Sequence, residues 1–192
     1  MEQKNIDRRV RKTKKLLRQG LTKLLQEKSV KDISVRELAD LVDINRGTFY
    51  IHYRDIFDMV EQIENEMFEE FNQVLTAHSP QELKGEPLPF LIDVFQFMAD
   101  YADMCLALLG KNGDIAFVDK LRGVVRTRCL DDWMRLFKVE HPGRYELVCS
   151  YIVSGCIGLI QKWLESGMHE SIKEIAWVAE QMIMGCLNPL LD

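Results

Sequence analysis

Hydrophobic residues recur at steps of three and four along most of the chain, which is the spacing of an amphipathic helix. This pattern predicts a first helix over residues 5–28 and a second that begins after Ser34, where Ser34 and Glu37 stand at the S-x-x-E positions of a capping box. A third, short helix is predicted over residues 46–53, with Asn45 as its N-cap. Because only three or four residues separate the second helix from the third, the two form a predicted helix-turn-helix unit.

Helical patterns also cover most of the chain after residue 55. Asp55 is a suitable N-cap for a fourth helix over residues 56–77, and a loop containing three prolines and a glycine follows over residues 79–89. Further helices are predicted over residues 88–109, 115–137, 144–166 and 172–187. Since no segment alternates strictly enough for a half-buried strand, the predicted fold is all-α. We expect one helix-turn-helix domain over residues 1–55 and a second helical domain over residues 56–192.

Charge is distributed unevenly along the sequence. Residues 1–60 contain 14 Lys and Arg against 9 Asp and Glu, whereas residues 61–192 contain 11 against 21. This asymmetry indicates that the first sixty residues meet a polyanion, with a solvated helix face as the alternative. The strongest basic cluster consists of Arg8, Arg9, Arg11, Lys12, Lys14, Lys15 and Arg18.

The composition argues against a disordered, a membrane-spanning and a disulfide-rich protein. With 47% hydrophobic and 29% charged residues, the chain is not intrinsically disordered. Its longest uncharged run, residues 147–161, is shorter than the roughly 18 residues of a membrane span. The five cysteines, an odd number without C-x-x-C spacing, favour buried thiols over disulfides or a zinc site, and a redox-sensing thiol is the alternative. We therefore expect a cytoplasmic protein that needs no membrane, metal or cofactor.

The third predicted helix has an unusual outer face. At 100° per residue, with Phe49 directed inward, Gly47 and Ile51 point outward and Thr48 and Tyr50 flank them. This face suits a DNA duplex, because Gly47 allows close approach, the two hydroxyls reach phosphates or base edges, and Ile51 can contact a thymine methyl. The alternative is that Tyr50 and Ile51 pack on the next domain. The candidate DNA-binding residues are Ser34, Arg36, Asn45, Arg46, Gly47, Thr48, Tyr50, Ile51, His52 and Arg54.

The run ISVRELADLVDINRGTFYIHYRD, residues 33–55, resembles the DNA-binding signature of the tetracycline-repressor (TetR) family. The capping box, the R-G-T-F-Y run and the H-Y pair all match, and the resemblance is strong over residues 8–60. The later runs LLGKNGD and GLIQKWLESGM are similar to the branch related to the dihydroxyacetone-kinase regulator. The resemblance implies an effector-responsive regulator, usually a repressor, whose second domain binds the effector and dimerises.

Three positions depart from the family pattern. Asp43 stands where the family usually has glycine at the turn, and Asp tolerates the left-handed conformation better than most residues. Gly20 stands where alanine is common and suggests a close helix crossing. Ile56 stands where the family often has a lysine that contacts phosphate, so we expect weaker DNA binding unless Arg54 compensates.

The last two predicted helices are candidates for a dimer interface. Residues 144–166 are apolar around most of the helix and include small residues that permit close approach, and residues 172–187 carry an apolar stripe. They are similar to the family's dimerising pair, although the core of a monomer is the alternative. The candidate interface residues are Ile152, Gly155, Leu159, Val178, Met182 and Ile183.

Aromatic and methionine side chains are dense in the middle of the chain. Most such residues are ordinary core, but a subset that lines a ligand cavity would fit the family. The candidate pocket residues are Phe68, Phe95, Met98, Tyr101, Met104, Phe117 and Trp133.

Common catalytic and metal-binding motifs are absent from the sequence. There is no H-E-x-x-H, G-x-S-x-G or G-x-G-x-x-G run, and no histidine follows a glutamate at E-x-x-H spacing. The predicted function is therefore not enzymatic. We expect a transcriptional repressor that binds palindromic double-stranded operator DNA as a homodimer and is released by an unknown small-molecule effector. A regulator controlled by a partner protein and a small helical enzyme or carrier are the alternatives.

Overall fold

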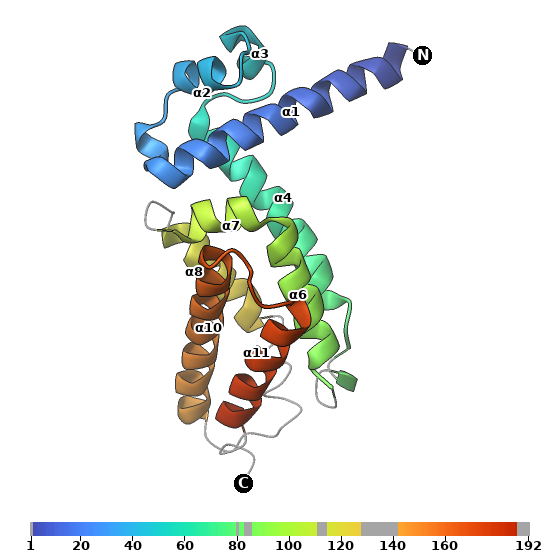
Figure 1. The fold of residues 1–192 in the computed structure, drawn as a ribbon, viewed down its shortest axis with the longest axis vertical. Helices are drawn as coiled ribbons and strands as arrows, with labels where there is room; N and C mark the ends of the chain where they lie inside the picture. Colours follow the sequence, from blue (N-terminus) through green and yellow to red (C-terminus); the bar gives the residue numbers. More distant parts are fainter. Residues whose placement is uncertain (1, 80, 83–85, 111–114, 128–141, 188–192) are drawn as a thin grey trace. The chain divides into compact units, whose positions relative to one another are not determined.

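The computed structural model describes residues 2–79, 81–82, 86–110, 115–127 and 142–187 (Figure 1). These residues form helices and connecting turns, with no strand among them, and the predicted all-α class is confirmed. They divide into two compact units. The first comprises Met1–Met67 with Ala107–Asp114, and the second comprises Phe68–Leu106 with Ile115–Asp192. The predicted domain boundary after residue 55 stays a prediction.

Helix α1, Glu2–Glu27, supplies much of the core of the first unit. Its Leu17 and Leu21 side chains are fully buried, as the period of three and four predicts. The short 3₁₀ helix η1, Val30–Asp32, then leads to α2, Val35–Leu41, which packs against α1 and against α3, Arg46–Tyr50. The apolar stripe of α1 therefore positions the two short helices.

Local hydrogen bonds explain where the short helices begin. The Ser34 hydroxyl oxygen accepts a bond from the Glu37 backbone N–H, 3.1 Å away, and Asn45 Oδ1 accepts from Gly47 N–H at 2.7 Å, so both predicted N-caps are confirmed. The predicted capping box is only half formed, because the Glu37 carboxylate accepts a bond from Lys28 Nζ. That bond lowers the pKa of Glu37.

The turn between α2 and α3 depends on a left-handed residue. Asp43 has a φ of 53°, a conformation that costs most L-residues free energy and that Asp tolerates comparatively well. The substitution of Asp for the usual glycine is therefore compatible with the same turn. The Ile44 N–H donates to the Ala39 carbonyl oxygen at 3.0 Å, which stabilises the exit from α2.

Helix α4, Ile56–Thr76, begins as predicted with Asp55 as its cap, since Asp55 Oδ1 accepts a bond from the Asp58 N–H at 2.8 Å. Within the first unit, the Arg18 guanidinium on α1 pairs with the Glu66 carboxylate on α4. The buried side chains of Met59 and Ile63 extend the core along α4.

The second unit is a bundle of longer helices. Its elements are the end of α4, α6 (Leu88–Asp100), most of α7 (Ala102–Leu109), α8 (Ile115–Val125), α10 (Pro142–Glu165) and α11 (Ile172–Leu187). Helix α11 packs against α6 and α10, and α10 also packs against α6 and α8 (Figure 1). Phe95 of α6 meets Trp163 of α10 edge to face, with ring centroids 5.5 Å apart. The single helix predicted over residues 88–109 is two helices, because Tyr101 leaves the helical conformation and caps α6.

One helix of the described part, Tyr145–Glu165, is long and apolar enough to cross a membrane by length and composition. This is weak evidence for a span, because core helices of soluble bundles have the same property, and 39% of the apolar window is already buried.

Candidate functional site

The outer face of α3 is exposed, as the helical period predicts. Phe49 is fully buried, whereas Tyr50 is 58% exposed and Ile51 is 76% exposed. The Tyr50 ring packs edge to face on Phe49, with centroids 5.5 Å apart, so the ring has a buried neighbour although most of the side chain is exposed. Within the first unit, no described residue covers Tyr50 or Ile51, and the alternative that they pack on the next domain stays a prediction.

The start of α3 presents small and polar groups. Gly47 is exposed, and a Cβ atom added there would lie 3.2 Å from Asn45 Oδ1. Thr48 is half-buried, and its backbone N–H donates to the Asn45 carbonyl oxygen at 2.8 Å. In Ser34 and Asn45 the side-chain oxygen accepts the capping bond. The Ser34 O–H and the Asn45 NH₂ group are hydrogen-bond donors that take no part in these caps. Both residues are exposed and can donate to phosphate oxygens.

The two predicted arginines of the short helices are exposed. Arg46 follows the Asn45 cap, and Arg36 lies on the first turn of α2. The Arg36 Nε atom is 3.6 Å from Asp40 Oδ2, with both side chains more than two-thirds exposed. Exposed ion pairs of this kind contribute little stability, so Arg36 can exchange Asp40 for a phosphate or a guanine edge at low cost.

Arg54, just before α4, is bonded to the carboxylate of Asp58 on the first turn of that helix. Its Nε and one terminal nitrogen donate to Asp58 Oδ1 at 3.2 and 3.0 Å, and its backbone N–H donates to Asp58 Oδ2 at 2.8 Å. These bonds, the backbone bond above all, lower the pKa of Asp58, and Asp58 raises the pKa of Arg54. Because Asp58 offsets the Arg54 charge, nothing here favours Arg54 as a replacement for the family's lysine. Ile56, at the lysine position, is buried.

His52 is half-buried, and burial together with the nearby Lys14 charge lowers its pKa below 6.5. The lowered pKa favours the neutral imidazole, which offers phosphate an N–H donor but no charge. Lys14 itself lies 3.9 Å from Glu66 Oε1 and 5.7 Å from the Tyr53 ring centroid. Positive charge beyond Lys14 and Arg18 is found on the exposed side chains of Arg8, Arg9, Arg11, Lys12 and Lys15.

An apolar face of α10 is exposed to solvent. Leu147 is 74% exposed and Tyr151 is 70% exposed, and the exposed Gly155 and Gly158 continue the same face at helical spacing. A Cβ atom added at either glycine would meet nothing within 4 Å. Helix α11 adds two exposed apolar side chains, Trp177 and Met182, which are 55% and 59% exposed.

Some of the predicted interface residues lie on the exposed apolar face of α10 and α11, and others lie in the interior of the second unit. Gly155 and Met182 are exposed, and Leu159 and Val178 are half-buried. Ile152 and Ile183 line a cavity of the second unit. The sequence pattern could not separate these two sets, because α10 is apolar around most of its circumference. It therefore missed Leu147, Tyr151 and Trp177, each of which is more than half exposed.

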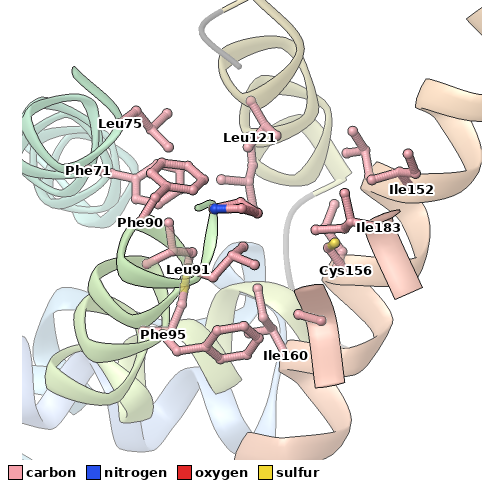
Figure 2. Close-up of a pocket in the computed structure, with 17 residues that line it drawn as sticks. Phe71, Leu75, Phe90, Leu91, Phe95, Leu121, Ile152, Cys156, Ile160 and Ile183 are labelled. Carbon is pink, nitrogen blue, oxygen red and sulfur yellow. The ribbon is translucent and has the colours of Figure 1, made fainter. Parts of the chain in front are cut away.

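The cavity of the second unit is partly open, has a volume of about 100 Å³ and lies among α4, α6, α8, α10 and α11 (Figure 2). Of the predicted pocket residues, Phe95 and Met98 line it. The other described candidates are not among its lining residues. The Phe68 ring packs at a tilt against Phe117 with centroids 5.1 Å apart, the Tyr101 hydroxyl donates to Glu70, and Met104 is buried. Trp133 lies outside the described residues.

Comparison with known proteins decides the family. Residues 85–185, more than half of the chain, match the TetR-type model described as a transcriptional regulator C-terminal region. The chain belongs to the TetR family of transcriptional regulators. A search of curated proteins gave no match. Members of this family are regulators and not enzymes, so the alternative of a helical enzyme or carrier is set aside.

Three solved structures of regulators share the fold. A TetR regulator from Streptococcus agalactiae 2603V is 19% identical, with a TM-score of 0.64 over 92% of this chain and 96% of that chain. The fatty acid degradation regulator FadR from Bacillus halodurans is 14% identical, with a TM-score of 0.64 over 91% and 96%. The dihydroxyacetone kinase operon activator DhaS is 14% identical, with a TM-score of 0.58 over 93% and 97%. At these identities the likeness concerns the fold alone.

Two cysteines of this TetR-family chain, Cys105 and Cys156, are held as neutral thiols by their surroundings. Burial raises the pKa of Cys105 to about 12 and that of Cys156 to about 11, so both thiols stay protonated at neutral pH. Within the described ranges, no cluster of three or more His, Cys, Asp or Glu side chains could hold a metal ion. Cys129 lies outside those ranges.

Proposed function

We propose that this TetR-family regulator is a cytoplasmic repressor that binds palindromic double-stranded operator DNA as a homodimer and is released when a small-molecule effector occupies the second unit. The observation that carries the proposal is the exposure of Tyr50, the last residue of α3, and of Ile51, its C-cap. A short helix with an aromatic hydroxyl, a methyl-bearing side chain and a glycine on its outer side is suited to the major groove.

The surroundings of α3 supply contacts to the DNA backbone. Arg36, Arg46 and the Ser34 hydroxyl are exposed beside it, and α1 carries further exposed cations. Contacts of this kind position a helix in the groove without reading sequence, and they make binding sensitive to salt. Base preference is then assigned to Thr48 and Tyr50 on α3 and to Ile51 at its C-cap.

The exposed face of α10 and α11 supports the homodimer. Exposed apolar side chains beside glycines that have open space above them favour close packing of a second apolar surface. A two-fold dimer presents the same face on both copies, and its two α3 helices would then address two half-sites related by symmetry.

Release follows from a shift between two states of the dimer. An effector lowers operator affinity only if it binds the DNA-incompetent dimer more tightly than the competent one. Helix α4 is a candidate for the coupling element, because it begins directly after the helix-turn-helix and contributes Phe71 and Leu75 to the cavity lining.

A pair of matched tyrosine variants tests the two surfaces separately. Tyr50 and Tyr151 are both exposed, so replacing either with alanine removes little packing. Tyr50→Ala is expected to abolish operator binding and leave the dimer intact, whereas Tyr151→Ala is expected to weaken the dimer. The readouts are fluorescence anisotropy with operator DNA and analytical ultracentrifugation. Unchanged DNA binding by Tyr50→Ala would remove α3 from the proposed interface.

A further inference from the structure

The cavity of the second unit has a chemically uniform lining. The described residues around it are Phe71, Leu75, Pro87, Phe90, Leu91, Val94, Phe95, Met98, Leu121, Val125, Ile152, Val153, Cys156, Ile157, Ile160, Ala179 and Ile183. None carries a charge, an amide or a hydroxyl. The thiol of Cys156 is the one weakly polar group of this set, and its raised pKa keeps it neutral.

Side chains on opposite walls face one another across this space. Figure 2 shows Phe90, Leu91 and Phe95 of α6 on one side, and Ile152 and Ile160 of α10 on the other. A charged or hydrogen-bonding group placed between these walls would lose its water without gaining a partner, which is unfavourable. A hydrocarbon group would instead exchange water contact for dispersion contact with apolar atoms on several sides.

We propose that this cavity binds the uncharged aliphatic part of a small molecule, with any polar group of that molecule kept outside the described lining. In another protein, an apolar cavity of about 150 Å³ stays dry and binds benzene. A cavity of about 100 Å³ therefore suits a chain of a few carbon atoms. The role of this site as the effector site rests on the proposed function, whereas its ligand preference does not.

Three six-carbon probes test the preference on the full-length protein. Hexan-1-ol, hexanoate at pH 8 and hexane-1,6-diol share a chain but differ in charge and in the number of polar ends. At the same millimolar concentration, hexan-1-ol is expected to raise the Tm by about 2–4 °C, and the other two are expected to raise it less. No rise with hexan-1-ol, or an equal rise with hexanoate, would overturn the proposal.

A variant with a filled cavity and a matched surface variant test whether the Tm rise depends on this cavity. Ala179→Leu adds volume inside the lining, whereas Ala116→Leu adds the same atoms at an exposed position on α8. We expect Ala179→Leu to lose the Tm rise with hexan-1-ol and Ala116→Leu to keep it. If Ala179→Leu fails to fold, Cys156→Met fills the same space with a flexible side chain. A Tm rise that persists in the filled, folded variant would overturn the assignment to this cavity.

Measuring operator affinity with and without hexan-1-ol shows whether ligand binding in the cavity is linked to release from DNA. A Tm rise that depends on the open cavity supports the ligand preference even where operator affinity is unchanged, and that combination would contradict the proposed release mechanism. Normal operator binding without any Tm rise would overturn the ligand preference and leave the DNA-binding proposal standing.

Discussion

Gly20 on α1 lies so close to Val42, at the end of α2, that a Cβ atom added at Gly20 would come within 2.4 Å of Val42 Cγ1. The same atom would lie 2.9 Å from Leu38 Cδ1. Real Cβ contacts are not this short, so the two helices cross at a distance that only glycine allows. The predicted close crossing at Gly20 is confirmed, and it sets the position of α2 on α1.

Gly20→Ala is expected to destabilise the protein even though alanine is the better helix former. The helix gains about 1 kcal/mol from alanine, but overpacking against the stiff Val42 and the buried Leu38 costs about 1–3 kcal/mol. In a Val42→Ala background the clash is reduced, and Gly20→Ala should become neutral or stabilising. Urea unfolding of the four proteins of this cycle measures the coupling. Gly20→Ala that stabilises the protein with Val42 present would contradict the close crossing.

Asp58→Asn is expected to strengthen operator binding by several-fold, because it frees the Arg54 guanidinium for a phosphate. Each added phosphate contact steepens the dependence of log affinity on log salt by about 0.9, so a dimer should change by up to about 1.8. Titrations at several salt concentrations measure the slope. The control is the same substitution in an Arg54→Gln background, where only the loss of a negative charge remains. Equal gains in both backgrounds would show that Arg54 does not reach the DNA.

Leucine at Gly155 or Gly158 is expected to break the dimer without harming the fold. A side chain at either position has open space within one chain, and leucine is a better helix former than glycine. It would, however, hold apart two closely packed copies of α10. Gly123→Leu on α8 is the matched control, because its Cβ also meets nothing within 4 Å. Sedimentation should show monomers for the first two variants and dimers for the control, and dimers throughout would exclude this face as the interface.

Stability is expected to fall as the pH rises above 9, in part because of Cys105. Its folded pKa of about 12 lies above the ordinary value of 9.0, so the unfolded chain releases the thiol proton first. The stability that the neutral thiol provides is complete below pH 9 and is lost between pH 9 and 12. Urea unfolding of the wild type and Cys105→Ala at pH 8 and pH 10.5 tests this effect. The variant should lose less stability over this range, and parallel losses would contradict burial of the thiol.

Local signals in the sequence predicted where the helices of the helix-turn-helix begin, whereas α3 ends at Tyr50 and not at residue 53 as predicted. The caps at Ser34, Asn45 and Asp55 depend on bonds within a few residues, and the outward direction of Tyr50 and Ile51 follows from helical period alone. The local pattern did not predict which side chains bond to each other between different elements. Glu37 pairs with Lys28, nine residues earlier, and not with its own cap.

The second unit was harder to predict because its function depends on which apolar residues face inward. On α10, Ile152 lines the cavity while Tyr151, its neighbour, is 70% exposed. Both are apolar enough for either role, so only the packing of α6, α8 and α11 around the helix distinguishes them. The same limit explains why Phe68 and Phe117, which pack against each other, were predicted to line a pocket.

Selection of bound sequences from a random pool of duplex DNA shows at once whether the protein binds DNA and whether it binds as a symmetric pair. We expect enrichment of an inverted repeat whose half-site centres are about 10–10.5 base pairs or a multiple apart. The Tyr50→Ala variant is expected to enrich nothing. A pool that stays random with the wild-type protein, or an enriched site without two-fold symmetry, would contradict DNA binding by a two-fold dimer through α3.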